Sequence, residues 1–340
     1  MKLITFDDFS DLYIKIIQRG FIYILSKLSI RNIKRTKSTF NSINIDSSNW
    51  WIIPMIKQRW NKLITGNPNI SYEEYISNEI FKEYKSFKIV SIGSGICSHE
   101  LLLAELNPHW KIDCIDISNK LLDKAQEIAL NKKLFNISFI CENIYKYELP
   151  DNFYDAILFH SSLHHINQIE DFISNKINDK LKPKGKLIIN EYVGVNRLQY
   201  SKKQIDAINV GIQLIDKKYR KIFKTNSYKS HYYGAGLIRM IISDPSECID
   251  SEKILPAIYK HFNVLIERPL GGNILMNVLK DISHHFVKMD NEKEEILKKI
   301  FEFEDSYLLN NRSDFLFGIY EKKEPKGEFV LVVKGKTEKE

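Results

Sequence analysis

The 340-residue chain contains little cysteine, and its four cysteines form no CxxC pair. Their positions, Cys97, Cys114, Cys141 and Cys248, also lack the spacing of metal ligands. Three of the four lie in apolar runs, which predicts small buried side chains in a reducing compartment. A disulfide scaffold and a cysteine-based metal site are therefore not expected.

The chain also lacks a long apolar run and blocks of like charge, and its first residues are not expected to be a signal peptide. Asp7 and Asp8 stand where a signal peptide carries positive charge, and the apolar run 21–25 is too short to span a bilayer. The net charge of +7 comes from scattered residues, 50 basic against 43 acidic. These absences predict a cytoplasmic protein without a membrane or nucleic-acid partner. Hydrophobic residues make up 44%, which supports a sizeable core.

Hydrophobic spacing indicates a helical N-terminal cap followed by an α/β core. Residues 1–80 are expected to be helical, with a tryptophan-rich helix near 50–60 and a helix over 72–84 that Ser71 caps. Residues 81–194 alternate apolar runs with helical segments. The expected strands are 87–92, 111–116, 136–140, 154–160 and 186–191, and the expected helices are 99–106, 120–130 and 168–181, with a turn at 183–185. This alternation predicts a doubly wound parallel sheet.

The alternation stops after residue 194. Residues 195–255 are expected to form a helical insertion or lid, and residues 256–325 to complete the sheet, with a strand at 261–266 and helices at 275–287 and 291–309. Two further runs, 315–321 and 329–333, compete as the completing strand, and we favour 315–321. Residues 326–340 are expected to be a tail.

The first and second expected strands end in residues that suit a nucleotide-like cofactor. Gly93-Ser94-Gly95 follows the first strand, where glycines permit a tight turn and the next helix N-terminus offers N–H groups to an anion. Asp116 ends the second strand, where a carboxylate can accept both hydroxyls of a ribose. A tight turn alone would explain the glycines, but the two features together favour cofactor binding. Ser98 stands where the dinucleotide fingerprint has its third glycine.

The runs 139–150, 154–166 and 181–187 resemble the class I S-adenosylmethionine-dependent methyltransferases, and the resemblance covers residues 87–191. Further runs at 190–194, 251–256 and 267–272 look like a bacterial subgroup whose substrate cannot be assigned. The resemblance implies a Rossmann-like methyltransferase sheet. It also implies S-adenosylmethionine as cofactor and S-adenosylhomocysteine as product.

The resemblance also assigns residues to the cofactor. Asp116 would hold the ribose hydroxyls, Ile117 would lie against the adenine, and His160 would lie near the methionyl group. The complete implied set is Gly93, Ser94, Gly95, Asp116, Ile117, Asn143, Ile144 and His160. Three positions depart from the family pattern and weaken the expected contacts. Ser91 replaces an acid, Cys97 a small residue, and Asn143 an aspartate.

Methyl transfer to a hydroxyl needs a base near the strand ends, and His164, His165 and Glu191 are the catalytic candidates. One histidine can equally cap or pack under the following helix. Glu191 can instead orient an amine or hydroxyl, or pair with a cation. A metal site built from His160 and His164 is not expected, because a four-residue spacing helps only on a helix. No metal is assigned.

In the insertion, aromatic residues flanked by glycines suggest a lid that contacts a substrate ring or sugar, although a packed surface loop explains them as well. The substrate-binding candidates are His231, Tyr232, Tyr233 and Arg239.

The sequence therefore predicts an enzyme that methylates a small or medium-sized acceptor, by O-methylation of a hydroxyl on a sugar, glycan precursor or other metabolite. The alternative within the same chemistry is N-methylation of an amine or peptide side chain, with Glu191 orienting the nitrogen. A non-catalytic binding protein with a cofactor fold is the alternative from another class. A base-methylating enzyme is disfavoured, because the fourth strand is followed by His160-Ser161-Ser162-Leu163 instead of the Asn/Asp-Pro-Pro-Tyr type motif. The N-terminal segment can serve a homodimer as well as a lid.

Overall fold

The computed structural model describes residues 2–19 and 48–324. The expected strand at 329–333 and the tail at 326–340 lie outside these ranges, as does the part of the predicted cap at 20–47. Among the helices of the described ranges, none has both the length and the hydrophobicity that a membrane span requires.

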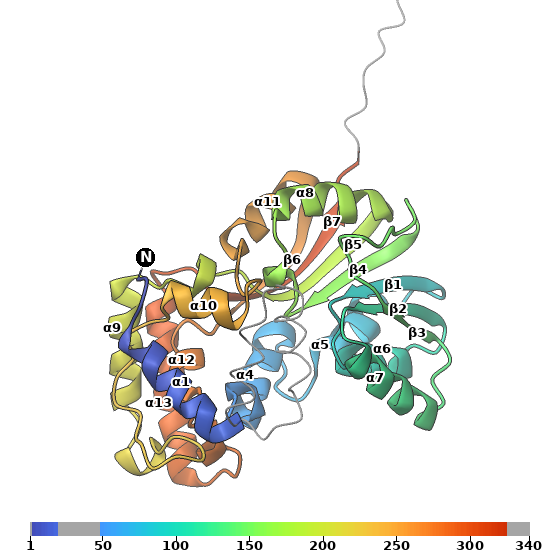
Figure 1. Ribbon diagram of the computed structural model, residues 1–340. Helices are drawn as coiled ribbons and strands as arrows, with labels where there is room; N and C mark the ends of the chain where they lie inside the picture. The colour runs from blue at the N-terminus through green and yellow to red at the C-terminus, as the bar shows by residue number, and fades with distance from the viewer. Residues whose placement is uncertain (1, 20–47, 325–340) are drawn as a thin grey trace, which may run out of the picture.

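The described residues form a seven-stranded sheet with the order β3-β2-β1-β4-β5-β7-β6 (Figure 1). The five strands from β3 to β5 are parallel, and β7 pairs antiparallel with both β5 and β6. The parallel sheet predicted from the sequence therefore gains one antiparallel strand. The bounds are β1 (Phe87–Ile92), β2 (Trp110–Asp116), β3 (Ile137–Cys141), β4 (Tyr154–His160), β5 (Leu181–Tyr192), β6 (Phe262–Gly271) and β7 (Phe315–Lys322).

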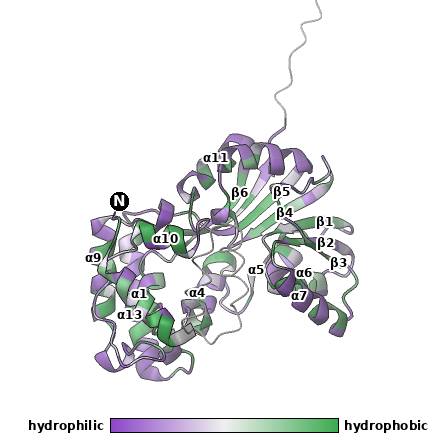
Figure 2. Cartoon of the chain, viewed as in Figure 1, coloured by the Kyte–Doolittle hydropathy of each residue, from purple (hydrophilic) through white to green (hydrophobic). Residues whose placement is uncertain are grey.

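Helices cover both faces of the sheet and bury two apolar layers (Figure 2). One face carries α6 (Ser98–Leu106) and α7 (Asn119–Asn131), with α4 (Pro54–Thr65) and α5 (Tyr72–Tyr75) beside them. The other face carries α8 (Ile169–Asp171), the continuing turns η4 (Phe172–Ile177) and η5 (Asn178–Lys180), and α11 (Ile254–His261). This arrangement leaves the carboxyl ends of the parallel strands open to a ligand.

A second group of helices packs beyond that open edge. It contains α1 (Phe6–Arg19) from the N-terminus, α9 (Lys202–Gln213) and α10 (Leu237–Ser243) from the insertion, and α12 (Leu275–Leu279) and α13 (Asn291–Leu308) from the C-terminal region (Figure 1). Short helical turns connect the elements: η1 (Trp50–Ile52), η2 (Ile76–Ile80), η3 (Leu163–His165), η6 (Asn196–Leu198), η7 (Lys217–Tyr219), η8 (Ser251–Lys253) and η9 (Ser283–Phe286).

The structure corrects three of the expected elements. The predicted turn at 183–185 is a bulge inside β5, where the register with β4 shifts and Lys184 has a φ of 61°. The predicted helix at 275–287 breaks into α12 and η9, because Asp281 has a φ of 69° and its N–H donates to Ser48 O. The helix at 72–84 ends with η2, although Ser71 and Glu74 form the expected cap, a reciprocal capping box. The strand favoured at 315–321 is confirmed as β7.

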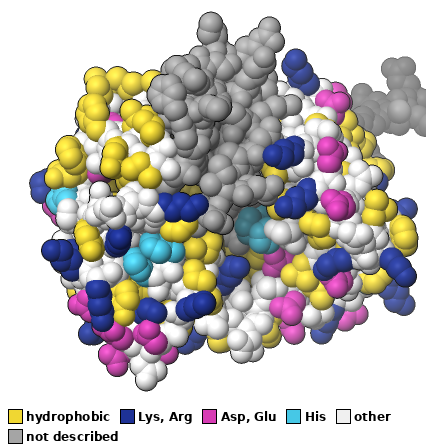
Figure 3. Space-filling model, turned by 60° about the horizontal axis from the view of Figure 1, so that its bottom comes forward, with side chains coloured by type: hydrophobic (Ala, Val, Ile, Leu, Met, Phe, Trp, Pro, Cys, Tyr) yellow, Lys and Arg dark blue, Asp and Glu magenta, His cyan; other side chains and the backbone are white. Residues whose placement is uncertain are grey.

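Charged side chains of both signs are interspersed on the face shown in Figure 3, without a continuous basic patch among the side chains drawn there. The described cysteines are all free thiols, with Cys97, Cys114 and Cys248 buried and Cys141 exposed.

Candidate active site

A cavity of about 650 Å³ lies at the carboxyl ends of β1, β2 and β4. It is lined mainly by apolar atoms and by the turns that follow these strands. The cavity brings together all eight residues that the sequence analysis assigned to the cofactor: Gly93, Ser94, Gly95, Asp116, Ile117, Asn143, Ile144 and His160.

The turn between β1 and α6 depends on its two glycines. Gly93 has a φ of +71°, and a Cβ there would lie 2.6 Å from the Cβ of Ser162. Gly95 has a φ of +57°, and a Cβ there would meet no atom within 4 Å. The N–H of Gly95 donates to Asp116 Oδ2 at 2.9 Å, and the N–H of Ser118 donates to Oδ1 at 2.7 Å. These bonds position the Asp116 carboxylate at the end of β2, where a carboxylate can accept from the hydroxyls of a ribose.

A buried carboxylate, Glu100 on α6, also lines this cavity. Ser91 on β1 donates its hydroxyl hydrogen to Glu100 Oε1 at 2.6 Å. The other oxygen, Oε2, is buried and finds no hydrogen-bond donor in the described part of the chain. Burial raises the pKa of the Glu100 carboxyl. Glu100 thus places an acidic group beside Ser91, the position where the sequence analysis noted a missing acid.

His160 lies in a stack of rings at the end of β4. Its ring centroid is 3.6 Å from that of His99, and its Nδ1 is 3.1 Å from the hydroxyl of Tyr72 on α5. Burial, together with the neighbouring His99, lowers the pKa of His160 well below its usual value. The opposite holds for His99, whose pKa is raised by a hydrogen bond to Glu73 in spite of burial. His160 is therefore a neutral wall of the cavity.

Glu191 is the second-last residue of β5 and is fully buried. Its Oε2 accepts hydrogen bonds from the backbone N–H groups of Ser162 and Leu163, both at 2.7 Å. Its Oε1 accepts from the N–H of Tyr192 at 3.0 Å and pairs with Nδ1 of His164. Glu191 lines neither this cavity nor the two cavities described below. Its contacts are those of a residue that positions η3.

The two histidines of η3 face different cavities. His165 lines the cavity at the strand ends, and His164 lines a neighbouring cavity of about 440 Å³. Burial alone would lower the pKa of His164, but the Glu191 carboxylate raises it to about 9. Burial and the adjacent His164 lower the pKa of His165. The Glu191 carboxylate thus favours a positive charge on His164, whereas His165 stays neutral.

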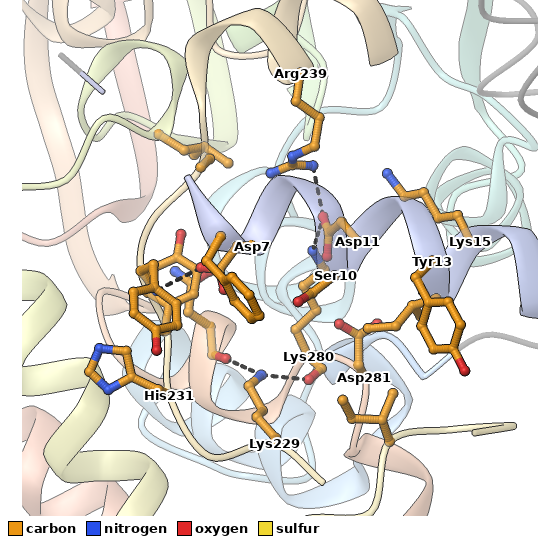
Figure 4. Close-up of a pocket in the computed structure, with 18 of the residues that line it drawn as sticks. Asp7, Ser10, Asp11, Tyr13, Lys15, Lys229, His231, Arg239, Lys280 and Asp281 are labelled. Atoms are coloured by element: carbon orange, nitrogen blue, oxygen red, sulfur yellow. Dashed lines mark hydrogen bonds and ion pairs between the residues drawn. The ribbon is translucent and has the colours of Figure 1, made fainter. Parts of the chain in front are cut away.

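The neighbouring cavity continues into a third of about 600 Å³ beneath α1. Its walls include the four predicted substrate-binding residues His231, Tyr232, Tyr233 and Arg239. Arg239 of α10 reaches Asp11 of α1, at 2.7 Å between Nη1 and Oδ2 (Figure 4). The second and third cavities share lining residues, among them Asp11, Glu247 and Lys280, and the first and second share Ser161. The three cavities are therefore neighbours.

Residues 90–189 match a protein family described as a methyltransferase domain. The chain carries a methyltransferase domain. It is an enzyme of the S-adenosylmethionine-dependent class, as the sequence resemblance implied. No curated protein sequence matches this methyltransferase.

Solved structures with a similar fold include the [4+2]-cyclase SpnF, at 14% identity and a TM-score of 0.45 over 75% of this chain and 81% of that chain. Phosphoethanolamine N-methyltransferase 2 of Haemonchus contortus has 17% identity and a TM-score of 0.45 over 75% of this chain and 53% of that one. The geranyl diphosphate C-methyltransferase of Streptomyces coelicolor A3(2) has 9% identity and a TM-score of 0.46 over 74% and 78% of the two chains.

The residues of the methyltransferase cavity fit S-adenosylmethionine. Asp116 suits the ribose, Ile117 and Ile144 give an apolar wall for the adenine, and the buried Oε2 of Glu100 suits the methionyl ammonium. Glu100, His99 and Tyr72 were missed by the sequence analysis, because no motif links them to the cavity. Glu247 was missed for the same reason, since it lies in a turn after α10, within the insertion.

Proposed function

We propose that this methyltransferase transfers a methyl group to a hydroxyl oxygen of a small or medium-sized acceptor. One observation carries the proposal. His165 lines the cavity at the strand ends and His164 lines the neighbouring cavity beneath α1, so the two histidines flank the place where an acceptor would meet the cofactor. When bound, S-adenosylmethionine supplies a sulfonium methyl group that the acceptor oxygen takes as its hydroxyl proton is lost, leaving S-adenosylhomocysteine.

The chain's residues would hold and activate the acceptor. The aromatic side chains of Tyr232 and Tyr233 suit the face of a sugar or another ring, and the combined space of the second and third cavities suits a metabolite. His165, whose lowered pKa keeps its ring neutral, would accept the hydroxyl proton, with His164 beside it. Glu191 would hold His164 in place through Nδ1.

Glu191 does not support the alternative in which it orients an amine. Its side chain is fully buried, and its two oxygens already contact Ser162, Leu163, Tyr192 and His164. We therefore propose a hydroxyl acceptor, with amine methylation as the competing outcome of the test.

The test compares two acceptor panels, one of polyols, sugars and phenols and one of primary and secondary amines. Methyl-labelled S-adenosylmethionine is the donor, and labelled product is followed by mass spectrometry. We expect labelled ethers from the hydroxyl panel. We expect His164→Ala and His165→Ala to lower kcat by about 10²-fold or more, with S-adenosylhomocysteine affinity within about threefold of wild type.

The matched control is His285→Ala. His284 and His285 form a second adjacent pair in η9, with ring centroids 3.9 Å apart, and neither residue lines the three cavities. This variant should keep wild-type turnover. Labelled products from amines alone, or full turnover by both η3 variants, would contradict the proposal.

A further inference from the structure

Three potential metal-ligating side chains converge between the cavity at the strand ends, the cofactor cavity, and the neighbouring cavity lined by His164, the acceptor cavity. The Nε2 atoms of His164 and His165 lie 3.9 Å from Oε1 and Oε2 of Glu247 respectively. In the described part of the chain, these residues form the one group of three or more histidine, cysteine or acidic side chains whose ligand atoms all lie within 4.8 Å of one another. A distance of 3.9 Å is too long for a hydrogen bond, and it leaves room for a cation between the atoms.

The other ring nitrogen of His164 is already fixed by a carboxylate. The two oxygens of Glu191 accept from three backbone N–H groups, and Oε1 is the acceptor toward Nδ1 of His164. The hydrogen of a neutral His164 ring therefore lies on Nδ1, and the lone pair lies on Nε2, the atom that faces Glu247. A carboxylate on the outer nitrogen is the usual support of a metal-binding histidine.

His165 has a comparable support through a serine. Ser246 donates its one hydroxyl hydrogen to Asp244 Oδ1 at 2.7 Å, and its Oγ lies 3.1 Å from Nδ1 of His165. Ser246 Oγ must then accept from Nδ1–H, which again leaves the lone pair of the neutral ring on Nε2. When both rings are neutral, two imidazole lone pairs and one carboxylate thus lie around the same space, where a divalent cation could bind all three.

The turn that carries Glu247 is fastened to the histidines. Arg197 donates to the backbone carbonyls of Pro245 at 2.6 Å and Glu247 at 3.0 Å, and the N–H of Ile249 donates to His164 O at 3.3 Å. The Glu247 side chain is 32% exposed, so it has room to move. Ligand atoms about 2.1 Å from a metal require the three side chains to close inward by about 1 Å.

We propose that His164, His165 and Glu247 bind one divalent transition-metal ion, of the Zn²⁺, Fe²⁺ or Mn²⁺ class. Two imidazoles and one carboxylate are the ligand set such ions take when further coordination positions stay open. His164 and Glu247 line the acceptor cavity, so an open position would face the acceptor. The role given to the ion rests on the proposed function. The ion, in place of the histidines, would activate the acceptor hydroxyl, because a hydroxyl coordinated to a metal ion loses its proton to water more readily.

The test measures metal binding without acceptor or turnover. The full chain is stripped with a chelator and titrated with Co²⁺, with visible absorption as the signal, and bound Zn²⁺ is counted by elemental analysis. We expect one equivalent in the wild type. His165→Ala and Glu247→Ala should weaken binding by about 10²-fold or more, while S-adenosylhomocysteine affinity reports that the cofactor cavity is intact.

His285→Ala again serves as the control. Among the described residues, the pair His284 and His285 forms no group with a carboxylate in which all ligand atoms lie within 4.8 Å of one another. This variant should bind metal as the wild type does. A wild type that binds no more metal than Glu247→Ala, or equal loss in His285→Ala, would overturn the metal site. Hydroxyl methylation without bound metal would refute the site and keep the proposed function. A bound metal with amine products alone would refute the proposed acceptor and keep the site.

Discussion

Glu100 shows how a single buried side chain can replace a motif residue. It lies in the first turn of α6, lines the cofactor cavity and receives a hydrogen bond from Ser91. Its Oε2 is buried without a donor among the described residues. An isolated buried carboxylate is unfavourable, so its position next to a cavity indicates a cationic partner. The methionyl ammonium of the cofactor is such a partner.

We therefore expect Glu100→Gln to raise the Kd of S-adenosylhomocysteine by about 10- to 100-fold, the loss of a charge-assisted hydrogen bond of about 1.5–3 kcal/mol. Isothermal calorimetry measures this change. The control is Glu105→Gln on the same helix, whose exposed carboxylate pairs with Lys132. Equal affinities of Glu100→Gln and the wild type would place the ammonium elsewhere.

Asp314 gives a second prediction, on stability against pH. Burial raises the pKa of its carboxyl from 3.8 to about 7, in spite of a hydrogen bond from Gln204 at 2.7 Å. Because the folded pKa lies above the unfolded value, the native state loses stability as pH rises from about 4 to 7. Asp314→Asn removes this loss.

The free energy of unfolding of Asp314→Asn, relative to that of the wild type, should therefore rise by a few kcal/mol between pH 4.5 and pH 8, as measured by urea unfolding. Asp123→Asn, an exposed control on α7, should show no such trend, and a pH-independent difference for Asp314→Asn would refute the prediction.

The cofactor residues that follow the strands were predictable from the sequence, because strand ends in a parallel sheet meet at one edge. Gly93, Gly95 and Asp116 each follow or end a strand, so pattern alone brings them together. Glu100 and Glu247 are different. Glu100 lies on a helix face, and Glu247 lies in a turn more than 80 residues from His164. Their placement depends on tertiary packing, which hydrophobic spacing does not encode.

At the level of elements, the N-terminal helix is held over the acceptor cavities by a small set of polar contacts. Arg239 of α10 pairs with Asp8 and Asp11 of α1, each at 2.7 Å, and Thr5 donates to Gly234 O at 2.6 Å. The Arg239 and aspartate side chains are largely buried, so these pairs are shielded from solvent. They couple the N-terminal segment to the insertion.

Arg239→Met should loosen α1, because it removes the cation that pairs with Asp8 and leaves Asp11 paired with Lys280, at a cost of about 1–3 kcal/mol. Amide exchange in residues 6–19 should then speed up by about tenfold or more. Lys202→Met is the control, since its ion pair with Asp206 is exposed on both sides and should contribute little. Unchanged exchange in α1 would mean that its apolar contacts alone hold it in place.

Strands were easier to predict than helices for a physical reason. The strands β1 and β4 have the predicted bounds, because a buried parallel strand is a short continuous apolar run. The helices near 76–80 and 275–287 deviate from the predicted bounds, because contacts with neighbouring segments determine their geometry. Asp281 leaves the helical conformation where its N–H meets Ser48 O, a contact between segments more than 200 residues apart.

For the molecule as a whole, a bound cofactor would contact the α/β core, η3 and the insertion at the same time. The cofactor cavity is lined by the core, by η3 and, through Pro245, Ser246 and Ile249, by the insertion. A ligand there stabilises all of these parts together. S-adenosylhomocysteine at a hundredfold excess over its Kd should stabilise the native state by about 2.7 kcal/mol. For a chain of 340 residues we expect a rise in Tm of about 4 °C.

Asp116→Ala should abolish most of this rise, because it removes the carboxylate that Gly95 and Ser118 position for the ribose. The shift is measured against each variant's own Tm without ligand, since the substitution also removes two hydrogen bonds from the β1–α6 turn. Asp123→Ala, an exposed aspartate on α7, should keep the full shift. If Asp116→Ala and Asp123→Ala responded alike, the ribose would bind away from the end of β2, and the assignment of the cavity at the strand ends would have to change.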